Sequence, residues 1–311
     1  MHLKQPLVFI ACLLQAASIA AQDSTTFINA IEDHRYDSVR HIRQQKAWDM
    51  LSKEDTTATS AFWPNIKPAL FFANVKKNIQ FPDKINQGKS TNFCGYAALT
   101  HLLLKYHPEL YIEYILSLYH TGSISLKKRT LKPSSEVRQA AGTLKNKGEL
   151  DVKHADQLWF LTLCDQFKGY MNIADHHYNP GDENAIWAGT NYAKFNRMLA
   201  DFTDYKLTRK GSDFLRPSNK NLYKYISGEL RSGVVLLYVN SKYLYPHKYA
   251  FFKLRAPTHF IVLYNLYKIG DMIEVQYWDY GLRTEQQITV KRLDKLIFGI
   301  TTIIPVTDEK N

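Results

Sequence analysis

Long apolar runs, internal repeats and low-complexity tracts are all missing from this sequence beyond its first 21 residues. Without an apolar run of spanning length, stable membrane insertion is not expected. Basic residues are scattered apart from residues 127–129, and no basic motif is interleaved with aromatic residues, so nucleic acid is not an expected partner. The adjacent His176 and His177 have no further His or Cys pair at ligand spacing, which disfavours a metal site, and no cofactor is expected.

The first residues have the pattern of an export signal. Lys4 precedes an apolar core over residues 7–14, and the small residues at 16–21 provide a cleavage site. Cys12 lies inside the apolar core with further apolar residues after it, which disfavours a lipoprotein anchor. We therefore expect a cleavable signal peptide over residues 1–21 and a secreted or periplasmic protein.

The sequence has an ordinary globular composition with an excess of positive charge. Of its 311 residues, 45% are hydrophobic and 22% are charged, which leaves ample length for a core. Lys and Arg number 40 against 29 Asp and Glu, which gives a net charge of +11. Such a balance favours acidic partners, although a soluble basic surface is the simpler explanation.

Two of the 3 cysteines, Cys94 and Cys164, remain once the signal peptide is removed. An exported protein with two cysteines ordinarily pairs them. Cys164, however, ends the apolar helical run 158–164, where a buried small hydrophobic residue is expected. Cys94 is then a free thiol in an exported protein, which calls for a chemical reason.

The hydrophobic pattern changes from helical to strand-like along the chain. An amphipathic helix is predicted within residues 22–60, followed by a connecting stretch over 62–81 that prolines interrupt. Further helices are predicted at residues 94–105, 108–119, 133–147, 155–170, 192–202 and 221–231, and a polar loop at 172–189. Strands are predicted at residues 233–239, 259–264, 273–278, 286–290 and 300–306. This order predicts an α+β domain over residues 83–306, with a helical layer facing an antiparallel sheet, after an N-terminal helical arm and linker over residues 22–82.

A candidate nucleophile lies where a polar loop meets an apolar helix. The loop runs over residues 87–93, and the helical pattern begins at Cys94. Unpaired N–H groups and the dipole at a helix start favour negative charge, so a thiolate is stabilised there over a thiol. The Cys94 N–H provides one donor for an oxyanion, and the Gln87 side chain is a candidate for the second. His101 and His107, further along, are expected on the helix surface.

A thiol nucleophile needs a base, and the base needs an orienting acceptor. His259 starts the second predicted strand and Asp279 follows the third, with a Gly270-Asp271 turn between them. A hairpin about this turn brings Asp279 back towards His259, where it can accept a hydrogen bond from the ring. Such pairing raises the basicity of His259 and favours the Cys94 thiolate. Trp278, next to Asp279, is a candidate shield of that hydrogen bond from water.

The order of these motifs resembles that of the papain-like cysteine peptidases, most of all their bacterial branch related to bacteriocin-leader (double-glycine) peptidases. In that branch a Gln precedes a Cys-Gly-x-Ala helix, which corresponds here to residues 94–97. A short helix like residues 222–231 and a strand like 233–237 precede a His-Phe-x-Val strand, and an Asp follows. The likeness covers roughly residues 85–290, and the helical stretch 108–203 is larger than the minimal domain of that branch.

The resemblance implies a role for each of the four candidate residues. Cys94 would be the nucleophile, His259 the general base and acid, Asp279 the orienting residue and Gln87 the oxyanion donor. The implied activity is a thiol hydrolase that cleaves an amide bond in a peptide, a protein or the peptide stems of cell wall. The implied fold is papain-like.

Two other functions fit the same residues. A transglutaminase or deamidase uses the same Cys-His-Asp set, and its acyl-enzyme can be captured by an amine in place of water. A non-catalytic binding module could keep the fold after losing activity. Residues 22–82 could also serve as an inhibitory segment or a docking arm.

Overall fold

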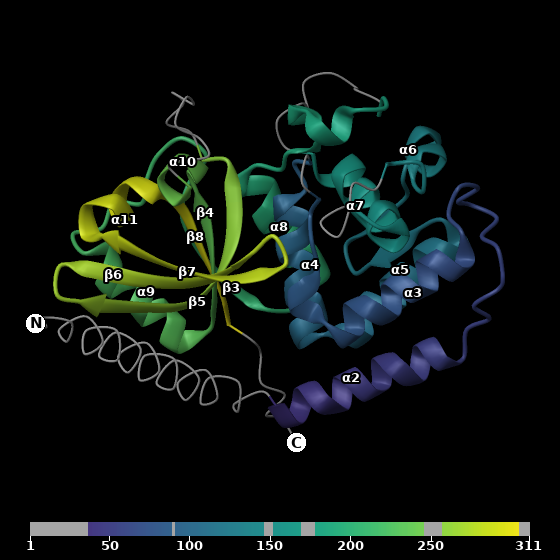
Figure 1. Cartoon of the computed structure of the whole chain (residues 1–311), viewed down its shortest axis with the longest axis horizontal. Helices are drawn as coiled ribbons and strands as arrows, with labels where there is room; N and C mark the ends of the chain where they lie inside the picture. The colour runs from purple at the N-terminus through teal and green to yellow at the C-terminus, as the bar shows by residue number, and fades with distance from the viewer. Residues whose placement is uncertain (1–36, 89–90, 146–151, 169–177, 246–256, 305–311) are drawn as a thin grey trace, which may run out of the picture.

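The computed structural model of the chain describes residues 37–88, 91–145, 152–168, 178–245 and 257–304. These residues form an α+β architecture in which a mainly helical part precedes a six-stranded antiparallel sheet (Figure 1). The predicted α+β class and the antiparallel sheet are therefore confirmed. The predicted signal peptide lies outside the described residues. Within these ranges, no helix combines the length and the apolar character that crossing a bilayer requires.

The main sheet has the strand order β3-β8-β4-β5-β6-β7, and a separate two-stranded sheet pairs β1 with β2. The strands are β1 Ile124–Leu126, β2 Arg129–Leu131, β3 Lys206–Gly211, β4 Val234–Val239, β5 His259–Ile269, β6 Met272–Asp279, β7 Leu282–Thr289 and β8 Ile297–Ile304. The predicted hairpin is confirmed, because β5 and β6 pair on either side of Gly270, whose φ of +59° suits glycine.

The helices fall into two groups on either side of this sheet. The larger group, with its short 3₁₀ turns, consists of α2 Asp37–Ser52, α3 Pro68–Gln80, η1 Pro82–Lys84, α4 Cys94–Tyr106, α5 Pro108–Thr121, α6 Ser135–Ala140, α7 His154–Phe167, η2 Asp182–Asn184, η3 Ile186–Ala188 and α8 Tyr192–Phe202. The smaller group consists of α9 Leu222–Ser232, α10 Ser241–Leu244 and α11 Val290–Leu296.

Both faces of the sheet are covered, as strand β4 demonstrates. Leu236 and Tyr238 pack into a core shared with the larger helical group, whereas Val235, Leu237 and Val239 pack into a second core. This alternation follows from the two-residue period of a strand. Helices α9, α10 and α11 close the second core, so the sheet lies between two layers of helix (Figure 1).

Helix α4, which begins at Cys94, is buried on all sides. Every residue from Cys94 to Leu104 is buried, because the helix lies between β5 and the helices α5, α7 and α8. A helix that is apolar all round is typical of such a position. The prediction that His101 lies on the helix surface is wrong: the residue is 0% exposed, since α4 has no face left for solvent.

Gly95 allows the start of α4 to approach the sheet and α8 closely. A Cβ at this position would lie 2.5 Å from Thr190 Cγ2 and 3.3 Å from the rings of Phe195 and Phe260. We expect Gly95→Ala to lower the free energy of unfolding by about 1–3 kcal/mol through overpacking. Chemical denaturation would measure this effect.

Gly228→Ala provides the matched control for Gly95→Ala. Gly228 lies within α9, where a Cβ would meet no atom closer than Arg231 Nη2 at 3.8 Å. Alanine there should stabilise the protein by up to about 1 kcal/mol, because it has the higher helix propensity. A Gly95→Ala protein as stable as the parent would contradict the close packing described above.

Several helix predictions need correction. The stretch 62–81, predicted as a connection, contains α3, because Pro68 occupies the first helical position, where its missing N–H costs nothing. The helix predicted at 133–147 is only α6. The chain turns at Gly142, where φ is +93° and a Cβ would lie 2.1 Å from the Asn65 carbonyl oxygen. Parts of the helix predicted at 155–170 and of the loop predicted at 172–189, including His176 and His177, lie outside the described residues.

Three strands had no counterpart among the sequence predictions. Strand β3 lies at the edge of the main sheet, and half of its residues are the basic Lys206, Arg209 and Lys210. An exposed edge strand needs no apolar run, so its pattern gives no signal. Strands β1 and β2, of three residues each, form a short hairpin whose turn is the basic pair at residues 127–128.

The described part of the predicted arm 22–82 packs into the same core as α4. Helix α2 contacts α5, and α3 contacts α7. Leu51, Phe71 and Val75 are buried in the core cluster that also contains the apolar residues of α4. The Asn74 side-chain oxygen accepts hydrogen bonds from the first N–H groups of α7. These residues therefore belong to the helical layer, and the domain boundary at residue 82 stays a prediction.

Candidate active site

Cys94 is the first residue of α4, as predicted. Its thiol donates to the Thr258 carbonyl oxygen, 3.9 Å away, at the residue before β5. Cys94 is a free cysteine and is 9% exposed, the largest fraction among the buried apolar residues that the structure describes. Cys164 is also free but is 0% exposed, as expected for a core residue. Burial raises the pKa of the Cys164 thiol well above its ordinary value, so this sulfur stays protonated.

His259 and Asp279 are joined by a short hydrogen bond. His259 Nε2 lies 2.6 Å from Asp279 Oδ1, and both residues are almost wholly buried. The register that pairs Val262 with Trp278 makes them diagonal neighbours on one face of the β5–β6 hairpin. The predicted contact is therefore present. Because Nε2 is used for Asp279, Nδ1 of the ring stays available, and the Cys94 sulfur is close enough to influence the charge of the ring.

The charges around His259 favour its protonated form. Burial of the ring lowers the pKa of His259, but the Asp279 carboxylate, the hydrogen bond to it and the Cys94 sulfur outweigh burial. As a result, the pKa of His259 lies well above its ordinary value. An imidazolium beside a thiolate is an ion pair, and the thiolate is the form of cysteine that attacks an electrophilic carbon.

Tyr245 is a further member of this network that the sequence did not reveal. It follows α10, and its hydroxyl donates to Asp279 Oδ2, the oxygen that His259 leaves free. The Tyr277 hydroxyl lies 3.4 Å from that of Tyr245. Burial and the neighbouring carboxylate raise the pKa of Tyr245, and burial raises the pKa of Tyr277 to about 12, so both hydroxyls stay protonated and can donate. Both oxygens of Asp279 therefore have a donor.

We expect Tyr245→Phe to lower kcat for the reaction proposed below by about tenfold, since a hydrogen bond to a charged group is worth about 1.5–3 kcal/mol. The carboxylate would lose the contact that fixes its plane relative to the His259 ring. KM should stay within about twofold, because Tyr245 acts on Asp279 and not on the substrate. Steady-state kinetics would separate the two constants.

Tyr277→Phe is the control for Tyr245→Phe, because it removes a hydroxyl one step further from Asp279. Among the described residues the Tyr277 hydroxyl bonds to that of Tyr245 and not to Asp279, so its loss should have the smaller effect on kcat. An equal or larger loss in Tyr277→Phe would contradict the assignment of Tyr245 as the residue that positions Asp279.

The aromatic ring that covers His259 belongs to Tyr280, not to Trp278. The Tyr280 ring stacks on the imidazole with 5.1 Å between ring centroids and 18° between planes. Tyr280 has a φ of +50° because it forms, with Gly281, the two-residue turn between β6 and β7. Trp278 instead stacks on His101 at 4.5 Å and donates to the Asp83 carbonyl oxygen at 3.0 Å. Through these two contacts Trp278 packs β6 against α4 and η1.

Gln87 lies in a loop that is fastened to the turn after Asp279. Asn86 donates from its side chain to the Tyr280 carbonyl oxygen, and Gly88 N–H donates to Asn86 Oδ1 at 2.8 Å. Gln87 is 5% exposed, and its side-chain amide makes no hydrogen bond to the residues that the structure describes. Its role as an oxyanion donor stays a prediction.

No family model matches the sequence, and a search of curated proteins finds no similar one. Among the described residues, no group of three or more His, Cys, Asp and Glu side chains could hold a metal ion. The prediction for His176 and His177 falls outside those residues. The described part places the Cys94 thiol beside the start of β5, where the His259 imidazole is hydrogen-bonded to the Asp279 carboxylate.

Proposed function

We propose that this chain is an exported papain-like thiol hydrolase that cleaves an amide bond in a peptide, a protein or cell-wall peptide. The observation that carries the proposal is the His259–Asp279 hydrogen bond together with the Cys94 thiol, which donates to the carbonyl oxygen of Thr258, the residue before His259, and raises the pKa of His259. These three groups are the ones required as a nucleophile, its base and the orienter of that base. The buried helix that begins at Cys94 and packs on an antiparallel sheet agrees with the papain-like resemblance.

The proposed reaction has two halves. The Cys94 thiolate attacks the amide carbon to form a tetrahedral adduct, and His259 then gives its proton to the leaving nitrogen as the C–N bond breaks. The products of this half are a free amine and a thioester. Water next gives a proton to His259 and attacks the thioester carbon, which releases a carboxylic acid and restores the thiolate–imidazolium pair.

The oxyanion formed in each half needs two donors. The backbone N–H of Cys94 is among the first four of α4, which have no partner within the helix. The Gln87 side-chain amide, on the loop before α4, is the proposed second donor. Tyr280 covers one face of the imidazole and so limits the access of water to the ion pair.

Export is part of the proposal and rests on the pattern of residues 1–21. A free cysteine in an exported protein has a function if it is the nucleophile, whereas a structural thiol there would ordinarily be paired. Acyl transfer to an amine proceeds through the same thioester, so an added amine can compete with water for it.

Alkylation of the mature protein with iodoacetamide across pH, read by mass spectrometry, tests the proposal. We expect Cys94 to react with a midpoint well below about pH 8.5, the ordinary value for a thiol, and Cys164 to stay unlabelled in the folded protein. His259→Ala should move the Cys94 midpoint upwards. The same pH midpoint for Cys94 in the parent and in His259→Ala would show that no thiolate–imidazolium pair exists.

Incubation with peptidoglycan and with a peptide library, with and without an added amine, would then separate hydrolysis from acyl transfer.

A further inference from the structure

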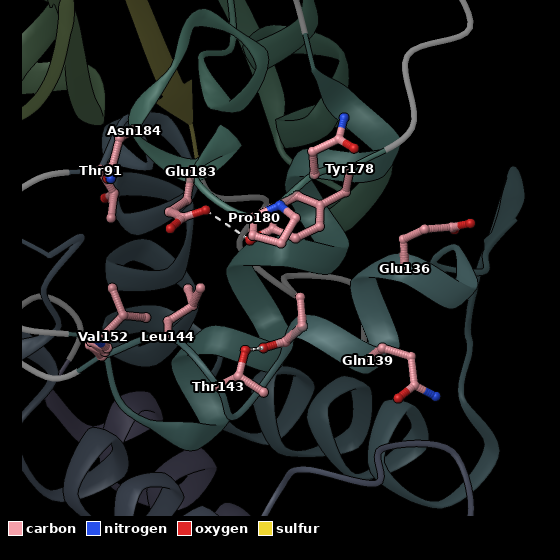
Figure 2. Close-up of a pocket in the computed structure, with 13 residues that line it drawn as sticks. Thr91, Glu136, Gln139, Thr143, Leu144, Val152, Tyr178, Pro180, Glu183 and Asn184 are labelled. Atoms are coloured by element: carbon pink, nitrogen blue, oxygen red, sulfur yellow. Dashed lines mark hydrogen bonds between the residues drawn. The ribbon is translucent and has the colours of Figure 1, made fainter.

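A cavity of about 700 Å³ lies beside the loop that leads to Cys94 (Figure 2). Its lining comes from four separate segments of the chain, one of which contributes Val152 alone. Thr91 belongs to the loop before α4, Glu136 and Leu144 to α6 and the turn after it, and Glu183 to η2. Figure 2 shows Glu183 close to Thr91 on one side of the view and Glu136 on the other.

The wall of the cavity is fastened to the loop that carries the proposed catalytic groups. The N–H of Asn92, two residues before Cys94, donates to the Glu183 carbonyl oxygen at 2.9 Å. At the other end of the loop, a Cβ on Gly88 would lie 2.6 Å from Val152, which lines the cavity. The cavity therefore adjoins the loop that runs from Gln87 to Cys94.

The charge of the cavity is opposite to that of the protein. The charged residues among its described lining are Glu136, Glu183 and Lys145, a balance of −1 in a chain of net charge +11. Glu183 Oε2 accepts hydrogen bonds from the Tyr178 hydroxyl at 2.8 Å and from the Gly181 N–H at 3.0 Å. These bonds fix the carboxylate, and its other oxygen makes no hydrogen bond to a described residue. The dashed line at Glu183 in Figure 2 marks the contact with Tyr178.

We propose that this cavity binds a basic aliphatic side chain of the substrate, that of lysine, arginine or another diamino acid, close to the scissile amide. This assignment rests on the proposed function of Cys94. The aliphatic stem packs against Ala140, Leu144 and Val152, and the cationic end pairs with the fixed carboxylate of Glu183. Glu136, on the opposite rim, adds attraction for the same charge.

Binding of peptides to the Cys94→Ala protein tests this subsite without turnover. The probes are two fluorescein-labelled octapeptide pools that differ at one fixed position, lysine in one and norleucine in the other, so the stems match and only the ammonium differs. Fluorescence polarisation should give a Kd about tenfold lower for the lysine pool. Glu183→Gln should reduce this ratio to below about threefold, because the amide keeps the acceptor for Tyr178 and Gly181 but removes the charge.

Two further variants keep the test decisive. Glu136→Gln, on the exposed first turn of α6, should also lower the ratio without touching the Tyr178 contact. Glu113→Gln changes the net charge equally, but Glu113 lies exposed on α5 and is not part of the lining, so the ratio should stay at the parental value. Equal binding of both pools by the parent, no binding of the lysine pool, or an unchanged ratio in both cavity variants would overturn the inference.

The outcome is separable from that of the proposed function. If the pH midpoint of Cys94 alkylation is that of an ordinary thiol but the lysine preference holds, the subsite is correct and the protein is a non-catalytic binding module. If Cys94 is activated but the pools bind equally, the subsite alone is wrong.

Discussion

Replacing Cys94 with serine is expected to lower kcat/KM for amide cleavage by about 10⁶-fold, the scale seen when the nucleophile of a catalytic triad is removed. An imidazolium beside Cys94 stabilises a thiolate, but a serine hydroxyl is far too weak an acid to ionise in that position. Serine has nearly the same shape, and it keeps a donor for the Thr258 carbonyl oxygen, so the fold should be preserved. Steady-state kinetics on a peptide from the library screen, with circular dichroism as the check on folding, would measure the loss.

Cys164→Ala is the matched control for Cys94→Ser. Cys164 is buried in α7 and its thiol contacts the Trp187 carbonyl oxygen at 3.7 Å, away from the proposed catalytic groups. Removing the sulfur should cost about 1 kcal/mol of stability through the small cavity that it leaves, with kcat unchanged. A Cys94→Ser protein that retains parental activity would rule out a thioester mechanism. Loss of activity in folded Cys164→Ala would instead mean that the two cysteines have been assigned the wrong way round.

The parts of the site that the sequence predicted are those with local signals. The Gly270-Asp271 turn fixes which residues of β5 and β6 face each other, so the approach of Asp279 to His259 follows from the hairpin alone. The start of α4 at Cys94 follows from the change from a polar loop to a run of apolar residues. Neither inference needs the rest of the molecule.

The parts that the sequence did not predict depend on contacts between distant segments. Tyr245 lies 34 residues before Asp279 and belongs to no motif, so its hydrogen bond becomes visible only once the fold brings the residue after α10 to Asp279. The stacking of Tyr280 on His259 could have been predicted only weakly from the local sequence. Tyr280 and Gly281 are the two residues between β6 and β7, and a two-residue turn favours a positive φ that points the tyrosine ring back over the strand. His101 was misplaced because amphipathic reasoning assumes one solvent-facing side, which α4 does not have.

Replacing Asp279 with asparagine is expected to move the alkaline limb of the pH–kcat/KM profile to lower pH by about 1–3 units, the scale of a nearby opposite charge. The amide can keep both contacts of the carboxylate, its oxygen accepting from His259 and its nitrogen donating to the Tyr245 hydroxyl. Geometry is then preserved and charge alone is lost. Burial lowers the pKa of His259, so without the negative charge of Asp279 that pKa must fall, and the imidazolium is lost at lower pH. The pH profile of the purified variant, with the parent measured in the same buffers, gives the shift.

The same change has a stability signature with a defined sign. Because the pKa of His259 is raised in the folded state, its contribution to stability is complete below about pH 6.5, its ordinary value, and is lost as the pH rises through the raised pKa. The difference in free energy of unfolding between parent and Asp279→Asn should therefore be largest in mildly acidic solution and shrink in alkaline solution. Asp279→Ala should lose kcat across the whole profile as well, because the ring then has no acceptor at Nε2. If Asp279→Asn leaves the alkaline limb in place, the charge of Asp279 does not set the protonation of His259, and the ion pair with Cys94 must be held by something else.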